Sequence, residues 1–351
     1  MQKKVLQIIN SPGLGGAETI AKKIAIEFRF PIFCLRNDSF NQFESLNVPV
    51  FFGTLSKHYK YNLKVFLKLK RIIKELKIEI LHVHLATSLF YAVLVKIFNP
   101  KLKLIYHEHG EIFRNNKLKI LFKIFRKKIN FVLAVSNVTK DEIIKKTFLD
   151  EEKIIVLHNF LCLENNFKQE LSKKFEKNKI LKIGFIGRLT EVKGCNILIK
   201  SLENLKIPFK CFIAGEGPQK EYLIKLTKDL LLEKNIVFLG YAAKENFYPE
   251  IDIIVIPSIY ESFGLVFLEA GFFKVPAIIS KTGGLLELGK DFENCVFFEP
   301  KNEADLQKKI EILYQDLELR KKIALNNSED IKSYDFKEFE KKINNIYDFF
   351  N

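Results

Sequence analysis

Cysteine is scarce in this sequence and never occurs in a paired arrangement. The five cysteines are odd in number, widely scattered, and contain no Cys-x-x-Cys pair. This pattern excludes a disulfide framework and the common zinc-binding motifs, and it indicates a reducing compartment. The cysteines are Cys34, Cys162, Cys195, Cys211 and Cys295.

Long hydrophobic runs are also absent. No stretch reaches the length of a membrane span, and the apolar run near the amino terminus is broken by Gln7 and ends at Asn10, too short for a secretory signal. We therefore expect a soluble, cytoplasmic protein. The 351 residues are 48% hydrophobic and 28% charged, with 16 glycines and 10 prolines, which is globular usage. Disorder, collagen and coiled coil are excluded for the chain as a whole, and its length predicts two domains.

Acidic residues are in short supply only in the first half. Residues 1–168 contain 29 Lys and Arg against 14 Asp and Glu, whereas residues 169–351 contain 28 of each kind. The formal net charge of +15 therefore lies entirely in the first half. Because a codon bias toward lysine would affect both halves alike, the asymmetry predicts an anionic partner for the first half: nucleic acid, a membrane surface or an acidic ligand.

Short, nearly continuous apolar runs recur along the chain, separated by helical patterns such as Thr19–Phe28. Continuous rather than alternating runs are typical of parallel strands covered by helices on both faces. The expected strands are Val5–Ile9, Ile32–Leu35, Val48–Phe52, Ile80–Val83, Leu102–Tyr106, Phe131–Val135 and Ile154–Leu157 in the first half, and Leu181–Ile186, Phe209–Ala214, Ile236–Leu239, Ile253–Ile256, Ala277–Ile279 and Val296–Phe298 in the second.

The strand–helix pattern occurs twice, on either side of the polar stretch 162–179, which we interpret as a linker. We therefore predict an α/β protein with two doubly wound, Rossmann-like domains facing each other, residues 1–168 and 169–335. The last segment, 336–351, is expected to form an amphipathic helix. Ligands of such sheets bind at the carboxyl ends of the strands.

A glycine-rich turn from Gly13 to Glu18 follows the first expected strand and opens a helix. Gly15 and Gly16 let backbone amides approach a ligand closely, and a helix N-terminus favours an anion. Glu18 stands where the dinucleotide-binding fingerprint has its third glycine, which excludes that fingerprint. The alternative is a plain strand-to-helix turn.

Two cations lie on one short loop after the first strand of the second domain. Arg188 offers a planar fork and Lys193 a point charge, so together they could neutralise a pyrophosphate without a metal ion. Two solvated surface cations are the alternative.

Two carboxylates, Glu261 and Glu269, follow the buried strand that ends at Ile256. A helix expected to start near Phe263 would return to nearly the same side after eight residues, so both carboxylates could line one cleft. The apolar neighbours of Glu269 argue against a merely solvated side chain.

Further glycines and histidines also follow expected strands. They are Gly215, then Gly283 and Gly284 with Glu287, and His107 and His109 in the first domain. Plain turns are the alternative for the glycines. The two histidines have no third metal ligand nearby in the sequence. We expect one of them to hydrogen-bond a substrate rather than to coordinate a metal.

These motifs, in this order and spacing, resemble the retaining GT-B glycosyltransferases of family four, also called glycosyl transferases group 1. The resemblance covers nearly the whole chain and is strongest in the second half, where a Pro-Ser-x-x-Glu-x-Phe-Gly-Leu context is matched almost letter for letter. The matching residues are Gly15, Gly16 and Glu18; Arg188 and Lys193; Glu261 and Glu269; and Gly283, Gly284 and Glu287.

The resemblance implies two GT-B domains across a cleft, an acceptor in the first and a nucleotide-sugar, expected to be a UDP-sugar, in the second. The catalytic residues would be Arg188 and Lys193, which would bind the diphosphate, and Glu261, which would bind the donor sugar. His109, or its neighbour His107, would reach that sugar from the first domain. The other expected substrate-binding residues are Glu269 on the ribose, the amides of Phe263, Gly264 and Leu265, Gly215 and Tyr241 near the base, and Gly15 and Gly16.

The resemblance also implies transfer with retention of the anomeric configuration by front-face displacement, with neither metal nor cofactor. The acceptor would be a glycan or lipid-linked glycan of surface polysaccharide or lipooligosaccharide synthesis, and helix 336–351 would cross back to the first domain. The alternatives are a nucleic-acid-binding protein that uses the basic half, which has no recognised nucleic-acid-binding motif, and a GT-B-like epimerase or phosphorylase.

Two basic segments of the first half, Lys57–Lys77 and Arg114–Lys128, combine cations with aromatic and aliphatic residues. In the second, apolar residues recur at helical spacing and predict a single stripe, formed by Leu118, Leu121, Phe122 and Phe125. We expect the second to lie on the inner face of the cell membrane, with its cations on anionic lipid and its aromatic rings entering the headgroup layer. The alternative is that the apolar stripe packs on the core.

Overall fold

The computed structural model describes residues 4–13, 15–37, 41–43, 46–54, 62–110, 116–147, 149–162 and 180–350. The chain divides into two compact units, one formed by Met1–Cys162 with Phe336–Asn351 and the other by Leu163–Asp335. The expected boundary between residues 168 and 169 lies outside the described residues. None of the helices in the described ranges combines the length and apolar character needed to cross a bilayer.

The first unit is built on a seven-stranded sheet in the order β3-β2-β1-β4-β5-β6-β7, with every pairing parallel. The order reverses between β1 and β4, which makes their carboxyl ends a topological switch point, where such sheets bind ligands. The strands are β1 Val5–Ile9, β2 Ile32–Arg36, β3 Val50–Thr54, β4 Ile80–His84, β5 Lys103–Glu108, β6 Phe131–Ala134 and β7 Ile154–Val156.

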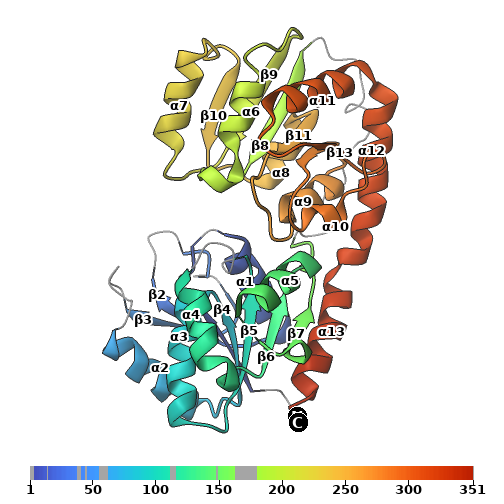
Figure 1. Ribbon diagram of the computed structural model, residues 1–351. Coiled ribbons are helices and arrows are strands. Elements are labelled where there is room, and N and C mark those ends of the chain that lie inside the picture. Colours follow the sequence, from blue (N-terminus) through green and yellow to red (C-terminus); the bar gives the residue numbers. More distant parts are fainter. Residues whose placement is uncertain are drawn as a thin grey trace. The chain divides into compact units, whose positions relative to one another are not determined.

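Helices cover both faces of this sheet. Neighbouring helices α2, α3, α4 and α5 form one layer, and α1 and α13 lie on the other side (Figure 1). Tyr347 of α13 is fully buried and packs edge-on against Phe30, which anchors the last helix to this unit. The helices are α1 Gly16–Phe28, α2 Leu63–Glu75, α3 Ala86–Phe98, α4 Asn116–Phe125, α5 Asn137–Thr147 and α13 Phe336–Asp348.

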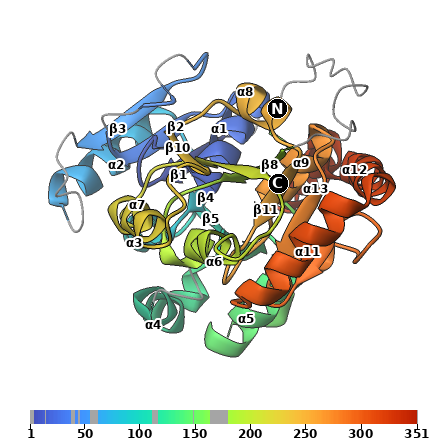
Figure 2. The same ribbon diagram turned by 90° about the horizontal axis from the view of Figure 1, so that it is seen from above.

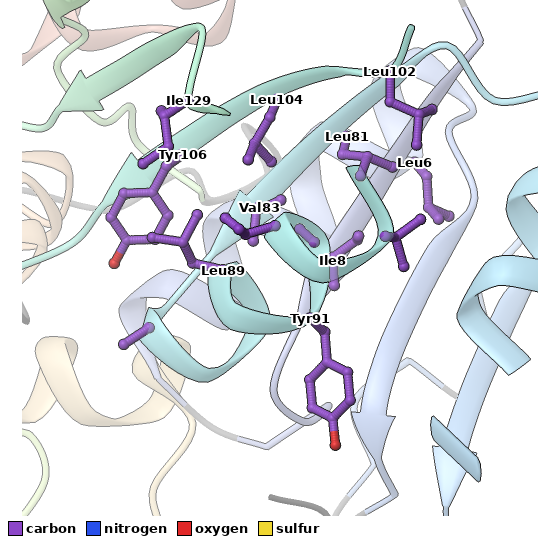
Figure 3. Packing of buried hydrophobic residues seen from close by; sticks show 14 of the residues in the cluster. Leu6, Ile8, Leu81, Val83, Leu89, Tyr91, Leu102, Leu104, Tyr106 and Ile129 are labelled. Carbon is purple, nitrogen blue, oxygen red and sulfur yellow. The ribbon is translucent and has the colours of Figure 1, made fainter. Parts of the chain in front are cut away.

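The larger core of the first unit lies between the sheet and α3. Alternate strand residues such as Leu6 and Ile8 meet Leu89 of α3, and all three are fully buried (Figure 3). The intervening residue Gln7 must therefore point to the opposite face, toward α1 and α13.

The helix expected at the membrane surface packs differently from the prediction. Phe122 of α4 is fully buried against Tyr106, and Leu121 and Phe125 are partly buried against the same core. The aromatic rings of α4 therefore serve the core, and the prediction that they enter a headgroup layer is wrong. Among the side chains of this helix that the structure describes, the exposed apolar ones are Ile120 and Ile124, which lie outside the expected stripe.

The second unit contains a six-stranded parallel sheet in the order β10-β9-β8-β11-β12-β13, whose direction of winding reverses between β8 and β11. Both sheets are thus doubly wound, as predicted. The strands are β8 Leu181–Ile186, β9 Phe209–Ala214, β10 Ile236–Gly240, β11 Ile253–Ile256, β12 Ala277–Ser280 and β13 Val296–Phe298.

On one face of the second sheet, α7, α6 and α11 lie side by side (Figure 2). Helix α12 packs on α9 at the other face, where Asn327 donates a hydrogen bond from its amide to the carbonyl of Phe267 at 3.2 Å. The helices of this unit are α6 Cys195–Ser201, α7 Lys220–Asp229, α8 Lys244–Phe247, α9 Leu265–Phe272, α10 Leu285–Leu288, α11 Glu303–Gln315 and α12 Leu317–Asp330.

Several element boundaries differ from the sequence prediction by one or two residues, and two of these differences have a clear backbone reason. Strand β3 begins at Val50 rather than Val48, because Pro49 has no N–H to offer the sheet; its carbonyl accepts from Ile32 at 2.9 Å. Helix α9 begins at Leu265 rather than near Phe263, because Gly264 has φ 117°, which is outside the helical region.

Candidate active site

Loops at the carboxyl ends of the second sheet hydrogen-bond to one another. After β8, the carbonyl of Val192 accepts from the amide of Ile259 after β11 at 2.8 Å, and the carbonyl of Glu261 accepts from the amide of Gly284 after β12 at 2.8 Å. The four motif loops after β8, β9, β11 and β12 are therefore one connected surface, because Leu189 also donates to Glu216 after β9 at 2.9 Å.

Glycines make these close approaches between loops possible. A Cβ on Gly283 would lie 2.0 Å from the carbonyl oxygen of Glu261, and one on Gly194 would lie 1.9 Å from that of Pro257. Both residues also have positive φ, 52° and 65°. No side chain fits there, so these glycines position the loop that carries Glu261.

Lys193 and Glu261 meet at the switch point of the second sheet. Their loops follow β8 and β11, and Lys193 Nζ lies 2.7 Å from Glu261 Oε2. The side chains are 31% and 13% exposed, and the Ser258 hydroxyl donates to the same carboxylate oxygen at 3.0 Å. Arg188 of the loop after β8 is exposed to solvent. The sequence places Arg188 and Lys193 on one motif and Glu261 on another, and the structure joins Lys193 to Glu261 in an ion pair.

Glu269 of α9 is held by two groups from the segment after β10. Lys244 Nζ lies 2.6 Å from Oε1, and the Tyr248 hydroxyl donates to Oε2 at 3.0 Å. The carboxylate is only 9% exposed, and burial together with the charge of Glu269 raises the pKa of Tyr248 well above its usual range. Tyr248 is therefore a neutral donor, and Glu269 is an ordered acceptor rather than a solvated surface charge.

Glu261 and Glu269 do not lie on the same helix. Because α9 begins at Leu265, Glu261 lies in the preceding loop, and the eight-residue helical step does not relate the two carboxylates. Each is positioned instead by its own lysine. Among the other expected residues, Phe263 is buried and Tyr241 is 62% exposed.

The glycines expected to bind substrate in the first unit lie at the start of α1. Gly15 is the residue before the helix, with extended backbone, and Gly16 is its first residue. A Cβ on Gly15 would lie 2.3 Å from Oε2 of Glu18, so the carboxylate folds back over the helix start. A carboxylate at this position already supplies the negative charge that a helix N-terminus favours.

Four histidines cluster at the carboxyl ends of β4 and β5. His84 Nδ1 lies 2.9 Å from His109 Nε2, and His82 Nε2 lies 3.3 Å from His107 Nδ1. Gln7 of β1 joins the two pairs, because its Oε1 is 2.7 Å from His84 Nε2 and its Nε2 is 3.2 Å from His82 Nδ1. The sequence showed His107 and His109 without further partners, and the structure brings two more imidazoles to them.

Burial keeps these imidazoles neutral. It lowers the pKa of His82, His84 and His107 well below the usual range, and neighbouring histidines lower each further. The same cause lowers the pKa of His109 to about 3, although its side chain is partly exposed. Ring nitrogens of His82, His84 and His107 lie within 4.8 Å of one another, a set that could hold a metal ion by ligand type.

The two halves of the chain match two families of one enzyme class. Residues 15–165 match Glycosyltransferase Family 4, and residues 166–330 match Glycosyl transferases group 1. The chain belongs to the group 1 glycosyltransferases. The two matches together cover residues 15–330, so the basic first half is part of a glycosyltransferase rather than of a separate nucleic-acid-binding protein.

Relatives of this glycosyltransferase come from archaea and bacteria. An uncharacterized glycosyltransferase of Methanocaldococcus jannaschii is 30% identical over 233 residues, which are 62% of this chain and 59% of the relative. The N-acetylgalactosamine-N,N'-diacetylbacillosaminyl-diphospho-undecaprenol 4-alpha-N-acetylgalactosaminyltransferase of Campylobacter jejuni is 25% identical over 347 residues, 93% of this chain and 94% of that protein. Homologues in O-antigen synthesis include WbnH of Escherichia coli, 27% identical over 335 residues.

Solved structures agree with the fold of the glycosyltransferase. Anabaena HepE in complex with UDP and glucose has a TM-score of 0.88 at 20% identity, and the match covers 98% of this chain and 99% of HepE. HepE in complex with UDP-glucose has a TM-score of 0.87 at 21% identity. The GT-B architecture with two Rossmann-like domains is therefore confirmed.

Several residues of the candidate site carry no signal in the sequence. Lys244 is one of many lysines, and Tyr248 stands in a stretch with no motif. Their association with Glu269 depends on how the segment after β10 packs on α9. Gln7 interrupts one apolar strand and His82 another, and these two interruptions were the available signs of a polar contact inside the first unit.

Proposed function

We propose that this glycosyltransferase moves a sugar from a UDP-sugar to a glycan or lipid-linked acceptor in surface-glycan synthesis, with retention of the anomeric configuration and without a metal ion. The observation that carries the proposal is the Lys193–Glu261 pair at the switch point of the second sheet, beside the exposed Arg188. A cation and a carboxylate there suit a diphosphate and a sugar hydroxyl, respectively. HepE, which shares the fold, binds UDP and UDP-glucose.

Each site residue has a proposed role in donor binding. Arg188 and Lys193 hold the diphosphate, and they offset the charge that develops on it as the sugar departs. Glu261 accepts hydrogen bonds from the donor sugar, and Glu269, ordered by Lys244 and Tyr248, accepts those of the ribose. The remaining proposed contacts are the amides of Phe263, Gly264 and Leu265 with the donor, Gly215 and Tyr241 with the base, and His109, Gly15 and Gly16 in the first domain.

A screen of nucleotides tests the donor. UDP-, GDP- and ADP-sugars are compared by thermal shift, and the anomeric configuration of the product is read by NMR after mass spectrometry has identified it. We expect a UDP-sugar to raise Tm most and to give a retained product whose formation continues in EDTA. An inverted product, or strict dependence on added Mg²⁺ or Mn²⁺, would contradict the proposed chemistry.

The outer helices of the first unit support an acceptor at an anionic membrane surface. Large apolar side chains on neighbouring helices α2, α3 and α4 are exposed, and Lys70 lies over the ring of Phe98 at 5.3 Å. We call these side chains the α2–α4 patch. Its members are Leu63, Leu67, Phe98, Ile120 and Ile124, which are 54–67% exposed.

The residues of the patch lie among cations. Lys123 of α4 and the following Arg126, Lys127 and Lys128 are exposed. Apolar side chains can enter the interface while each lysine or arginine adds about 1 kcal/mol near anionic lipid. Lys60 and Arg114, which belong to the two expected basic segments, lie outside the described residues.

Liposome flotation tests the membrane proposal. The protein should float with vesicles that contain anionic lipid at low salt, and raising the salt should release it because the attraction is screened. Replacing Lys123, Arg126, Lys127 and Lys128 with serine should abolish flotation and leave UDP binding unchanged. The matched control removes the same charge from exposed lysines of the second unit, Lys206, Lys308, Lys321 and Lys322. Equal loss in both variants, or no flotation of the wild type, would refute this surface.

A further inference from the structure

The histidine cluster of the first unit contains one group whose polarity is fixed by its chemistry. An amide side chain has an end that only accepts and an end that only donates, whereas a neutral imidazole can carry its proton on either nitrogen. Gln7 Oε1 therefore accepts from His84 Nε2 at 2.7 Å, and Gln7 Nε2 donates to His82 Nδ1 at 3.2 Å. His84 must therefore donate to Gln7, and His82 must accept from it.

The position of the proton on the His109 ring follows from its position on His84. His84 carries its single proton on Nε2, so its Nδ1 is an acceptor. The contact of 2.9 Å between His84 Nδ1 and His109 Nε2 then requires His109 to donate from Nε2. One neutral ring has one N–H, and therefore His109 Nδ1 is left as an acceptor.

The other branch of the cluster obeys the same rule. His82 Nδ1 accepts from Gln7 and from the hydroxyl of Tyr347, which lies 2.6 Å away, so the proton of His82 is on Nε2. That nitrogen donates to His107 Nδ1 at 3.3 Å, and His107 must be protonated on Nε2, a buried atom without a hydrogen-bond partner among the described residues. Gln7 is thus the branch point of two ordered chains.

The hydrogen bonds favour this arrangement over a metal site. The six ring nitrogens of His82, His84 and His107 form five contacts of hydrogen-bond length with neighbours, and only His107 Nε2 has none within the described ranges. A metal ion would have to replace several of these bonds at once. Neutral rings that share protons need no such replacement, and burial holds them neutral.

We infer that Gln7, acting through His84, is a positioning residue that holds His109 in the tautomer with its proton on Nε2. The inference rests on the proposed function, in which His109 contacts the donor sugar. In this tautomer His109 Nδ1 can accept a hydrogen bond from a sugar hydroxyl but cannot donate one. The network therefore selects a hydroxyl donor on the ligand. Gln7 acts at a distance, because it lies on β1 whereas His109 follows β5.

The tautomer can be measured without any assay of activity. The chain has six histidines, so long-range proton–nitrogen NMR of protein labelled with ¹⁵N-histidine resolves few rings, and a His109→Phe variant assigns the signal of His109. We expect His109 of the wild type to be neutral with its proton on Nε2. A proton on Nδ1, or a bound Zn²⁺ that removes the pattern when Zn²⁺ alone is titrated, would overturn the inference before any variant of Gln7 is made.

Two variants separate the branches. Gln7→Met keeps the length of the side chain and removes its polarity, so His84 and His109 should become mixtures of tautomers. Tyr347→Phe removes a hydroxyl that contacts His82 Nδ1 and also hydrogen-bonds Gln7, but it leaves the contact between Gln7 Oε1 and His84 Nε2 in place. It therefore serves as the matched control for a change in the same core. His109 should keep its tautomer in Tyr347→Phe, and an unchanged His109 in Gln7→Met would overturn the inference.

Kinetics give the second readout. We expect kcat/KM for a UDP-sugar to fall about tenfold in Gln7→Met, the equivalent of one neutral hydrogen bond, and to change little in Tyr347→Phe. The Kd of UDP should stay the same in both, because the proposed UDP site lies in the second unit. A mixed tautomer with unchanged kcat/KM would remove Gln7 from the positioning role. Absence of UDP binding and turnover in the wild type would instead refute the proposed function and leave the measured tautomer standing.

Discussion

Replacing Glu261 with Gln should strengthen the binding of UDP while it weakens turnover of a UDP-sugar. In the absence of ligand, Glu261 Oε2 lies 2.7 Å from Lys193 Nζ and neutralises the cation that we assign to the diphosphate. The diphosphate of UDP must compete with this carboxylate. Glutamine keeps the shape of the side chain and an oxygen for the Ser258 hydroxyl, so the loop should retain its conformation.

The size of the effect follows from the exposure of the pair. A fully exposed ion pair contributes about 0.2–1 kcal/mol, and a pair in less polar surroundings contributes more. Because the lysine is 31% and the carboxylate 13% exposed, we expect about 1 kcal/mol. That corresponds to UDP binding about fivefold tighter in Glu261→Gln. The loss of a charged acceptor for the donor sugar should lower turnover by at least about tenfold.

Isothermal titration calorimetry with UDP is the assay, on the wild type, Glu261→Gln, Lys193→Met and the double variant. Lys193→Met should weaken UDP binding, and Glu261→Gln should then have no further benefit because its cation is gone. Glu299→Gln is the matched control, since it removes a carboxylate from an exposed pair with Lys281 elsewhere in the second unit. If Glu261→Gln binds UDP no tighter than Glu299→Gln does, the competition argument is refuted.

Two further predictions concern buried charges. Glu269→Ala should weaken UDP binding by about 1–3 kcal/mol in the same titration, through lost hydrogen bonds to the ribose, and an unchanged Kd would remove Glu269 from the site. Lys96 is 7% exposed, and burial followed by the charges of Lys103 and Lys128 lowers its pKa to about 8. The unfolded chain therefore binds the proton more tightly, so Lys96→Met should stabilise the fold at pH 7 by about 1–2 kcal/mol. This gain should shrink between pH 8 and pH 10.5 in urea unfolding, and a gain independent of pH would contradict it.

The strands were predictable because their signal is local. Each of the thirteen expected apolar runs forms a strand, since a parallel strand covered on both faces needs apolar residues at nearly every position. The errors lie at ends of elements, where one residue decides. Pro49 delays β3, and the backbone of Gly264 delays α9.

The second-unit motifs could be recognised for a similar reason. Each lies within one loop, and the glycines that allow the loops to touch are part of the same few residues. The partners of the carboxylates could not be recognised in this way. Lys244 reaches Glu269 from a different element, and a lysine is too common in this chain to stand out.

The charge asymmetry predicts an anionic partner for the first half, but it does not identify the apolar residues that accompany the cations. The sequence predicts a helical stripe within Arg114–Lys128, yet a stripe does not indicate whether it faces the core or a membrane. The buried ring of Phe122 shows that the stripe faces the core. Ile120 and Ile124, which lie outside the stripe, are the exposed apolar side chains among those described on this helix, so the useful signal was an apolar residue out of phase with the stripe.

Gln7 likewise carries little signal in the sequence. In the sequence it only breaks an apolar run, because the groups that it contacts lie 75 and 77 residues away on β4. A polar residue inside a strand that is buried on both faces must find a partner or destabilise the fold. Its partners must then be polar residues that share its face on adjacent strands, and β4 offers His82 directly opposite and His84 two residues on. An isolated polar residue in a continuous apolar strand therefore points to a buried network, even where no motif marks the other members.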